Sequence, residues 1–229
     1  MKKILALVFA LTLILALFAG CDSSTNGNNS TNNTSQEQTS ELEINDDPIV
    51  FNGTGDKVVS NVNIPKGTFY AVLSHKGSGN FITDLYYGDG KYDYVSLSNK
   101  IGNYEGMSAM TELDGKAVAN GTLEVKADGE WAIEFKRVSG TSDKKLSGSG
   151  DYISGLIDVT SARNTVKLTH SGSRNFIVDI IQNDGGKYDY ESLANKTGEY
   201  EGETIANLKA GKKYYISVVA DGDWTIEIS

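Results

Sequence analysis

The chain has 229 residues, of which 39% are hydrophobic, 22% charged and 9% aromatic, with one Cys and two His. Hydrophobic content near the globular norm excludes a wholly disordered chain, and a single cysteine excludes a disulfide scaffold and a multi-cysteine zinc site. The net charge of −9 argues against nucleic acid as a partner, because nucleic-acid binding depends on Lys and Arg meeting phosphates.

The first 20 residues have the pattern of a secretory signal peptide. Two lysines precede an apolar run, Ile4 to Phe18, which is shorter than the about 20 residues that cross a bilayer as a helix. The run ends in Ala19-Gly20-Cys21, which resembles the lipobox of bacterial lipoproteins. The resemblance implies that residues 1–20 are a lipoprotein signal peptide and that Cys21 is acylated. It also implies that the protein is lipid-anchored to the cell membrane and faces the extracytoplasmic side.

Residues 21–46 have a low-complexity composition in which Ser, Thr, Asn and Gln dominate. Such a segment buries too little apolar surface to offset the entropy lost on ordering. We therefore expect a disordered tether that holds the folded part away from the membrane.

The remainder of the chain contains one sequence twice. The block Leu73 to Ile82 recurs as Leu168 to Ile177, and the blocks Lys-Tyr-Asp-Tyr and Ala-Asp-Gly-x-Trp also occur in both copies. Both histidines and both tryptophans of the chain fall at equivalent positions. The duplication predicts a first domain at 47–137, a linker at 138–147 and a second domain at 148–229.

Each copy has the pattern of β-strands. Phe69, Ala71, Leu73 and His75, for example, lie at alternate positions, which is the period of a strand with one buried face. Asp-Gly and Asn-Gly pairs between such runs indicate hairpins, and no amphipathic run is long enough for a helix. The sequence therefore predicts an all-β fold of two tandem antiparallel β-sandwiches, jelly-roll-like, with seven or eight strands each.

The C-terminal strand carries a second resemblance. Gly211 to Val218, with the sequence Gly-Lys-Lys-Tyr-Tyr-Ile-Ser-Val, resembles a strand of bacterial pre-peptidase C-terminal domains. These domains are small jelly rolls appended to secreted proteins, and some of them bind calcium or protein surfaces. The resemblance implies the sandwich fold and leaves the activity open.

The two histidines are interpreted as structural residues. Each lies on the apolar side of its strand and is followed by a turn that leads to Asn and Phe. We expect each imidazole to be buried and bonded to the backbone or to the nearby Asn, where it pins a hairpin, and each Trp to lie in the core. The positions assigned in this way are His75, His170, Asn80, Asn175, Trp131 and Trp224.

The chain is rich in tyrosine, with 12 Tyr against 7 Phe. Exposed Tyr gives a binding surface a large apolar area with a polar tip, although Tyr also suits the half-buried face of a sheet. The candidate binding residues are Tyr86, Tyr87, Tyr92, Tyr94, Tyr188 and Tyr190.

Motifs of catalytic or cofactor sites do not occur in the sequence. A catalytic histidine needs a nucleophile and an orienting acid, and no motif supplies them. The aspartates mostly precede Gly or lie in turns, where Asp is favoured for backbone reasons, and the calcium loop Asp-x-Asp-x-Asp-Gly is absent. We expect no catalytic residue, no metal and no cofactor, with calcium left open as an alternative.

These features predict a surface lipoprotein whose sandwiches form a non-catalytic binding module. The membrane would be reached through the anchor on Cys21, and the partner would be an envelope or extracellular protein. A polysaccharide bound by the Tyr-rich loops is one alternative, and a hydrolase or metal-dependent enzyme is another. The identity of the ligand is left open.

The substitution Cys21→Ser tests the anchor. Because Cys21 is the only thiol of the chain, its loss should move the protein from the membrane fraction into the medium. A variant that stays with membranes after carbonate washing, as measured by immunoblotting, would contradict the lipoprotein interpretation.

Overall fold

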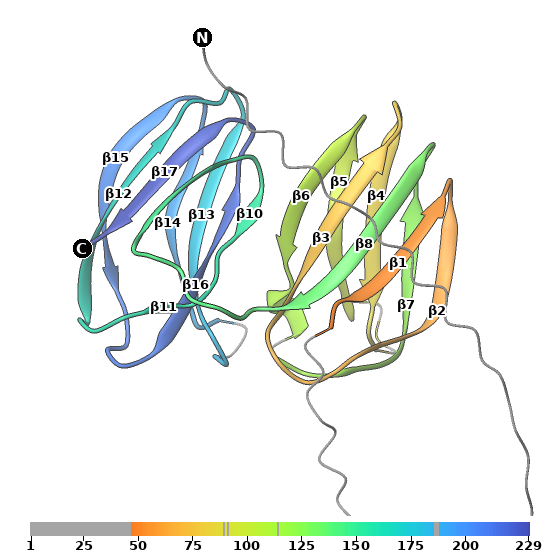
Figure 1. Cartoon of the computed structure of the whole chain (residues 1–229), viewed down its shortest axis with the longest axis horizontal. Coiled ribbons are helices and arrows are strands. Elements are labelled where there is room, and N and C mark those ends of the chain that lie inside the picture. The colour runs from red at the N-terminus through yellow and green to blue at the C-terminus, as the bar shows by residue number, and fades with distance from the viewer. Residues whose placement is uncertain (1–46, 89, 91, 114, 186–187) are drawn as a thin grey trace, which may run out of the picture. The chain divides into compact units, whose positions relative to one another are not determined.

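The computed structural model describes residues 47–88, 90, 92–113, 115–185 and 188–229. The signal peptide, Cys21 and the tether predicted for residues 1–46 lie outside this range. Strands make up most of the described residues, and the helical element among them is one short 3-10 helix, η1 (Thr111–Leu113) (Figure 1). In this part of the chain we find no helix with the length and apolar character needed to cross a membrane.

The first copy folds into two four-stranded antiparallel sheets. Its strands are β1 (Ile49–Thr54), β2 (Lys57–Ile64), β3 (Phe69–Lys76), β4 (Asn80–Tyr86), β5 (Tyr94–Ile101), β6 (Tyr104–Ala109), β7 (Val118–Lys126) and β8 (Glu130–Arg137). The strand orders are β1-β8-β3-β6 in one sheet and β2-β7-β4-β5 in the other.

The second copy repeats this arrangement. Its strands are β9 (Lys145–Ser149), β10 (Tyr152–Ile153), β11 (Ile157–Asp158), β12 (Arg163–His170), β13 (Asn175–Gln182), β14 (Tyr190–Thr197), β15 (Tyr200–Asn207), β16 (Lys213–Val219) and β17 (Asp223–Ile228). One sheet has the order β15-β12-β17-β9. The other has the order β10-β16-β13-β14, and β11 also pairs with β16.

Both sandwiches have the strand order of a jelly roll. The first, eighth, third and sixth strands form one sheet, and the second, seventh, fourth and fifth form the other. In the second copy β10 and β11 together take the place of β2. The predicted pair of jelly-roll-like sandwiches is therefore confirmed. β9 begins at Lys145, within the range that was predicted as linker, and pairs with β17 of the second sandwich.

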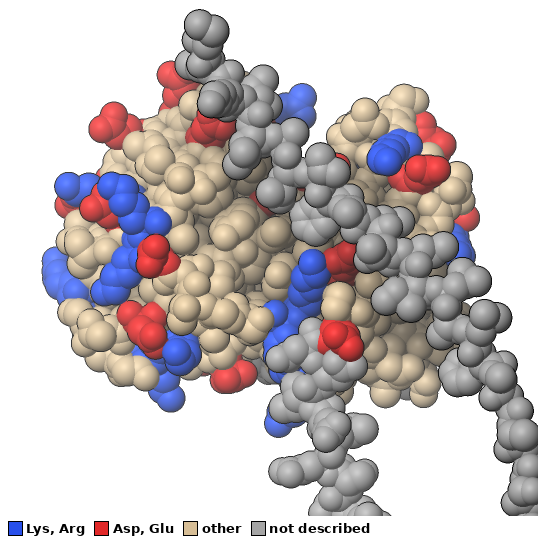
Figure 2. All heavy atoms as spheres, in the orientation of Figure 1, with Lys and Arg blue, Asp and Glu red and all other residues tan. Residues whose placement is uncertain are grey.

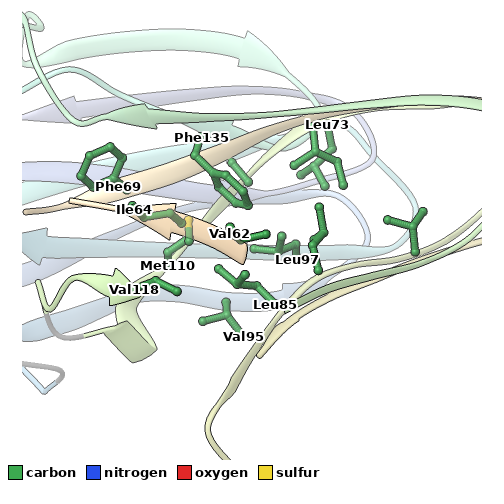
Figure 3. Packing of buried hydrophobic residues seen from close by; sticks show 14 of the residues in the cluster. Val62, Ile64, Phe69, Leu73, Leu85, Val95, Leu97, Met110, Val118 and Phe135 are labelled. Carbon is green, nitrogen blue, oxygen red and sulfur yellow. The ribbon is translucent and has the colours of Figure 1, made fainter. Parts of the chain in front are cut away.

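The alternation seen in the sequence separates the two faces of each strand. Side chains on the outer faces are largely polar, and Figure 2 shows acidic and basic residues interspersed on the visible face. Side chains on the inner faces are apolar. Figure 3 shows Leu73 and Phe135 from one sheet of the first sandwich turned toward Leu85 and Val95 from the other. Each large side chain buried in this way contributes about 1.5–3 kcal/mol to the free energy of unfolding.

A smaller apolar cluster joins the two sandwiches, which belong to one compact unit. Its buried residues are Val138, Ile153, Ile181 and Tyr215, and Tyr70, Met107, Ala109 and Leu156 pack against them. We call this cluster, together with the polar bonds beside it, the module contact. Its strand residues come from the outer faces of β3, β6, β10, β13 and β16, and Val138 and Leu156 lie outside the strands, so a sheet face that is exposed in a lone sandwich is covered here.

Asp151 provides the polar part of the module contact. Its Oδ2 accepts hydrogen bonds from Lys100 Nζ and Tyr104 Oη, each at 2.7 Å, while its Oδ1 accepts one from the amide of Ala220 at 3.0 Å. Burial, and after it the charge and hydrogen bond of Asp151, raise the pKa of Tyr104, so that this phenol stays protonated and donates. The Asp151 side chain is only 5% exposed, and its charge is balanced by Lys100.

The second sandwich should fold without the first. A chain of residues 143–229 contains both of its sheets, and we expect a β-type circular dichroism spectrum and a single cooperative thermal transition. The matched fragment 151–229 lacks β9 and the carbonyl of Gly150, which accepts the Trp224 indole N–H at 2.9 Å. This shorter fragment should melt at a clearly lower temperature. A broad, non-cooperative transition for residues 143–229 would show that the two sandwiches depend on each other.

Candidate functional site

His75, the penultimate residue of β3, is a buried side chain with three defined neighbours. Its Nδ1 lies 2.8 Å from the carbonyl oxygen of Gly102, and because a carbonyl can only accept, Nδ1 carries the hydrogen. Its Nε2 lies 3.3 Å from Oδ1 of Asp128. The ring stacks on Phe81 with 4.8 Å between the ring centres and 7° between the planes. Nδ1 therefore ties the end of β3 to the β5–β6 turn, while Nε2 faces Asp128 of the β7–β8 hairpin without a hydrogen bond among the described residues.

Asp128 also holds the turn that follows His75. Its Oδ2 accepts hydrogen bonds from the amide and hydroxyl of Ser78, both at 3.0 Å, and from the amide of Gly79 at 2.8 Å. The bonds from the Ser78 and Gly79 amides lower the pKa of Asp128, which keeps the carboxylate ionised. A Cβ at Gly77 would overlap Asp128 Oδ1 and the ring of His75, so only glycine fits between them.

The second copy has the same arrangement. His170 Nδ1 lies 2.8 Å from the carbonyl oxygen of Gly198, and Nε2 lies 3.4 Å from Asp221. The ring stacks on Phe176 with 4.7 Å between centres. The predicted burial of both histidines agrees with these positions. Their ring nitrogens meet a backbone carbonyl and an aspartate, whereas Asn80 and Asn175 are exposed at the starts of β4 and β13.

The histidine arrangement does not have the order of a nucleophilic site. In such a site a base must reach the hydroxyl that it activates. Here the hydroxyl of Ser78 bonds to Asp128, and the carboxylate stands between this hydroxyl and the imidazole. These contacts of His75 and His170 fit the structural role that the sequence predicts.

Trp131 and Trp224 lie in the two hydrophobic cores, where the sequence placed them. Each indole N–H donates to a backbone carbonyl at 2.9 Å, that of Gly55 or of Gly150. The two tryptophans thus stabilise the sandwiches.

The predicted tyrosines fall into two groups. Tyr86 and Tyr94 are paired across β4 and β5, with 5.6 Å between ring centres. Tyr87 is different, because it packs against the first core and its hydroxyl lies 3.5 Å from the carbonyl oxygen of Glu112. The structure therefore separates Tyr87 from the exposed candidates.

The most exposed tyrosines occupy equivalent loops in the two copies. Tyr92 is 78% exposed and Tyr188 is 82% exposed, and each begins a Tyr-Asp-Tyr segment, residues 92–94 and 188–190. The central aspartates hold the loops: Asp93 accepts the amide of Gly90 at 2.9 Å, and Asp189 pairs with Lys209 at 2.9 Å. The duplication thus presents the same aromatic segment twice.

The second Tyr-Asp-Tyr segment lies beside a groove, a hollow of about 120 Å³. Its walls include Tyr188, Tyr190, Tyr214, Lys209 and Gln182. The Oε1 of Gln182 is buried and meets no donor within the described part of the chain. In the first copy the position of Gln182 is taken by Tyr87, and that of Tyr214 by Gly121. The sequence analysis did not predict Lys209 or Gln182 as site residues. The sequence difference that marks this groove is Gln182, which stands where the first copy has Tyr87.

Two further findings concern metal ligands and related proteins. Among the described residues, no group of three or more His, Cys, Asp or Glu side chains is placed to hold a metal ion. No protein-family model matches the chain, and no curated protein matches it. The candidate site therefore rests on its own geometry.

The substitution His170→Ala tests the structural assignment. It removes the bond to Gly198 and the stacking on Phe176, and loss of a buried hydrogen-bonded group costs on the order of 1–3 kcal/mol. The melting temperature of the chain should fall clearly, while binding per folded molecule should stay unchanged. Unchanged melting combined with lost binding would make this histidine a functional residue.

Proposed function

We propose that the chain is an extracytoplasmic lipoprotein whose two sandwiches act as non-catalytic binding modules for an envelope or extracellular protein. The observation that carries the proposal is the pair of Tyr-Asp-Tyr segments, in which Tyr92 and Tyr188 are 78% and 82% exposed at equivalent positions. Exposed Tyr at both positions is typical of a surface that binds, since its ring offers contact area and its hydroxyl a hydrogen bond.

The geometry of the two Tyr-Asp-Tyr segments supports a role in binding a partner. A Tyr side chain has only two rotatable angles, so little entropy is lost when it is fixed against a partner. The carboxylates of Asp93 and Asp189 tie the backbone of each segment to its surroundings. A preorganised loop binds more tightly than a loop that must order on contact.

The lipobox resemblance supports a membrane location for these modules. The acidic chain, with its net charge of −9, has no general attraction to anionic lipid, so the acyl groups on Cys21 would supply the attachment. Two modules in one anchored chain would also raise the avidity for a partner that carries repeated sites.

A polysaccharide is the second candidate ligand, and the groove of the second copy favours it. Tyr188 and Tyr190 offer ring faces on which a sugar ring can stack. The buried Oε1 of Gln182 could accept a hydrogen bond from a sugar hydroxyl. Because this groove lies in the second copy, a saccharide ligand would use one module, whereas a protein partner would use both.

The double substitution Tyr92→Ser and Tyr188→Ser tests the proposal. The full chain is assayed against arrays of purified bacterial envelope proteins and polysaccharides. Each Tyr should contribute about tenfold in affinity, as a central aromatic contact does, so the double variant should lose binding. Ile101→Ser is the matched control, since Ile101 is 77% exposed and lies outside the loops.

The outcomes separate the two ligands. Loss of protein binding in both single variants supports the protein partner. Loss of polysaccharide binding in Tyr188→Ser and Gln182→Ala, but not in Tyr92→Ser, supports the saccharide. Wild-type binding by the double Tyr variant would overturn the proposed binding segments.

A further inference from the structure

The polar part of the module contact joins a Lys–Tyr pair to an Asp, and the internal repeat supplies both the pair and the Asp twice. Lys100 and Tyr104 of the first sandwich hold Asp151 of the second, each at 2.7 Å. The internal repeat places Lys196 and Tyr200 of the second sandwich at the positions of Lys100 and Tyr104. The two pairs also share their geometry, because the Lys nitrogen lies 5.0 Å from the Tyr ring centre in the first copy and 5.5 Å in the second.

The carboxylate half is repeated as well. Asp56 is the first-copy equivalent of Asp151. Its Oδ1 accepts a hydrogen bond from the amide of Ala127 at 3.0 Å, just as Asp151 accepts one from the amide of Ala220 at 3.0 Å. The two aspartates therefore cap the same hairpin and differ in what meets their second oxygen.

The second set of groups is exposed. Asp151 is buried by its contact with Lys100, whereas Asp56 and Lys196 are both exposed. Within the described part of the chain, Lys196 contacts the ring of Tyr200 but forms no ion pair, and Asp56 meets no cation. One molecule thus carries an exposed carboxylate on its first sandwich and an exposed Lys–Tyr pair on its second.

Two of the apolar positions beside these groups show the same correspondence. Ile153, buried in the module contact, corresponds to Val58, which is 64% exposed. On the opposing face, Ala109 corresponds to Ile205, which is also exposed. The match is partial, because Tyr70, Met107 and Tyr215 correspond to Thr165, Glu203 and Thr122. A second contact of this kind would accordingly be weaker than the one within the chain.

We propose that two copies of this chain associate head to tail through a second set of the same contact. The Asp56 turn of one molecule docks on Lys196 and Tyr200 of the next, with Val58 facing Ile205. The charges are complementary, and the contact within each chain supplies the template for the geometry. A pairing of different surfaces gives a ring when its rotation closes and an open chain when it does not, so one contact leaves a further pair of surfaces available for the next molecule.

A hollow on the second sandwich includes Tyr200, but not Lys196, in its walls. Its volume is about 820 Å³, and Glu199 and Glu201 also border it. In the first sandwich the equivalent residues Asn103, Tyr104 and Glu105 border a cleft that is shared with Asp151. The group that contacts Lys100 and Tyr104 belongs to a sandwich of the same sequence type as the first. A second copy of the chain has another such sandwich, which carries Asp56. The Tyr-Asp-Tyr segments take no part, so this proposal stands or falls separately from the proposed function.

Charge reversal tests the pairing with the full chain, kept in solution by a mild detergent. Sedimentation velocity should show wild-type association that grows with concentration and weakens with salt. Lys196→Glu alone places two carboxylates together, and Asp56→Lys alone places two ammonium groups together, so each variant should be monomeric. An equimolar mixture of the two variants should associate again, because every contact then joins opposite charges. Lys212→Glu, the same charge change in the β15–β16 loop, is the matched control and should associate like the wild type.

A second variant guards against misfolding, since Asp56→Lys also removes the acceptor for the Ala127 amide. Asp56→Asn keeps an acceptor oxygen and removes only the charge, and it should weaken association about tenfold. A wild-type chain that stays monomeric up to roughly 1 mM would overturn the proposal. Association that survives both Lys196→Glu and Asp56→Asn would overturn it as well, as would a mixture of reversed variants that remains monomeric.

Discussion

Each sandwich can bury only one face of each of its strands, and this constraint decides what is left for contacts. The inner faces are filled by apolar side chains from both sheets, among them Leu73 and Leu85 in the first copy. Everything else that the chain does must use outer faces, edges and loops. The module contact uses outer faces of β3, β6, β10, β13 and β16, and the exposed tyrosines lie in the loops between β4 and β5 and between β13 and β14.

The fold was accessible to sequence reasoning because its signals are local. Alternation along a strand and Asp-Gly pairs at hairpins are both read within about ten residues, and the duplication supplied each signal twice. The start of β9 was missed for a physical reason. Lys145 to Ser149 is an edge strand that is held to β17 through its backbone and leaves most of its side chains exposed, so it carries no apolar pattern.

The candidate site was only partly accessible. Burial of His75 follows from its position in the strand, but its partners Gly102 and Asp128 are distant in sequence and are brought together only by the fold. Adjacent residues Tyr86 and Tyr87 look alike in a sequence, yet one lies on the outer face of β4 and the other packs on the core. The groove at Gln182 arises where the second copy departs from the first, and its meaning needs the three-dimensional neighbours Lys209 and Tyr214.

The two carboxylate oxygens of Asp151 make different contacts. One oxygen caps the hairpin of its own sandwich, and the other joins a neighbouring sandwich through Lys100 and Tyr104. A lone ancestral unit would need the carboxylate for its own hairpin, as Asp56 does in the first copy. Duplication of such a unit would create the polar half of an interface without any new residue, leaving only the apolar half to be acquired by later substitutions. Adding further repeats to this protein would then need few mutations. The Asp that caps the hairpin of its own sandwich is also the residue that contacts the neighbouring sandwich.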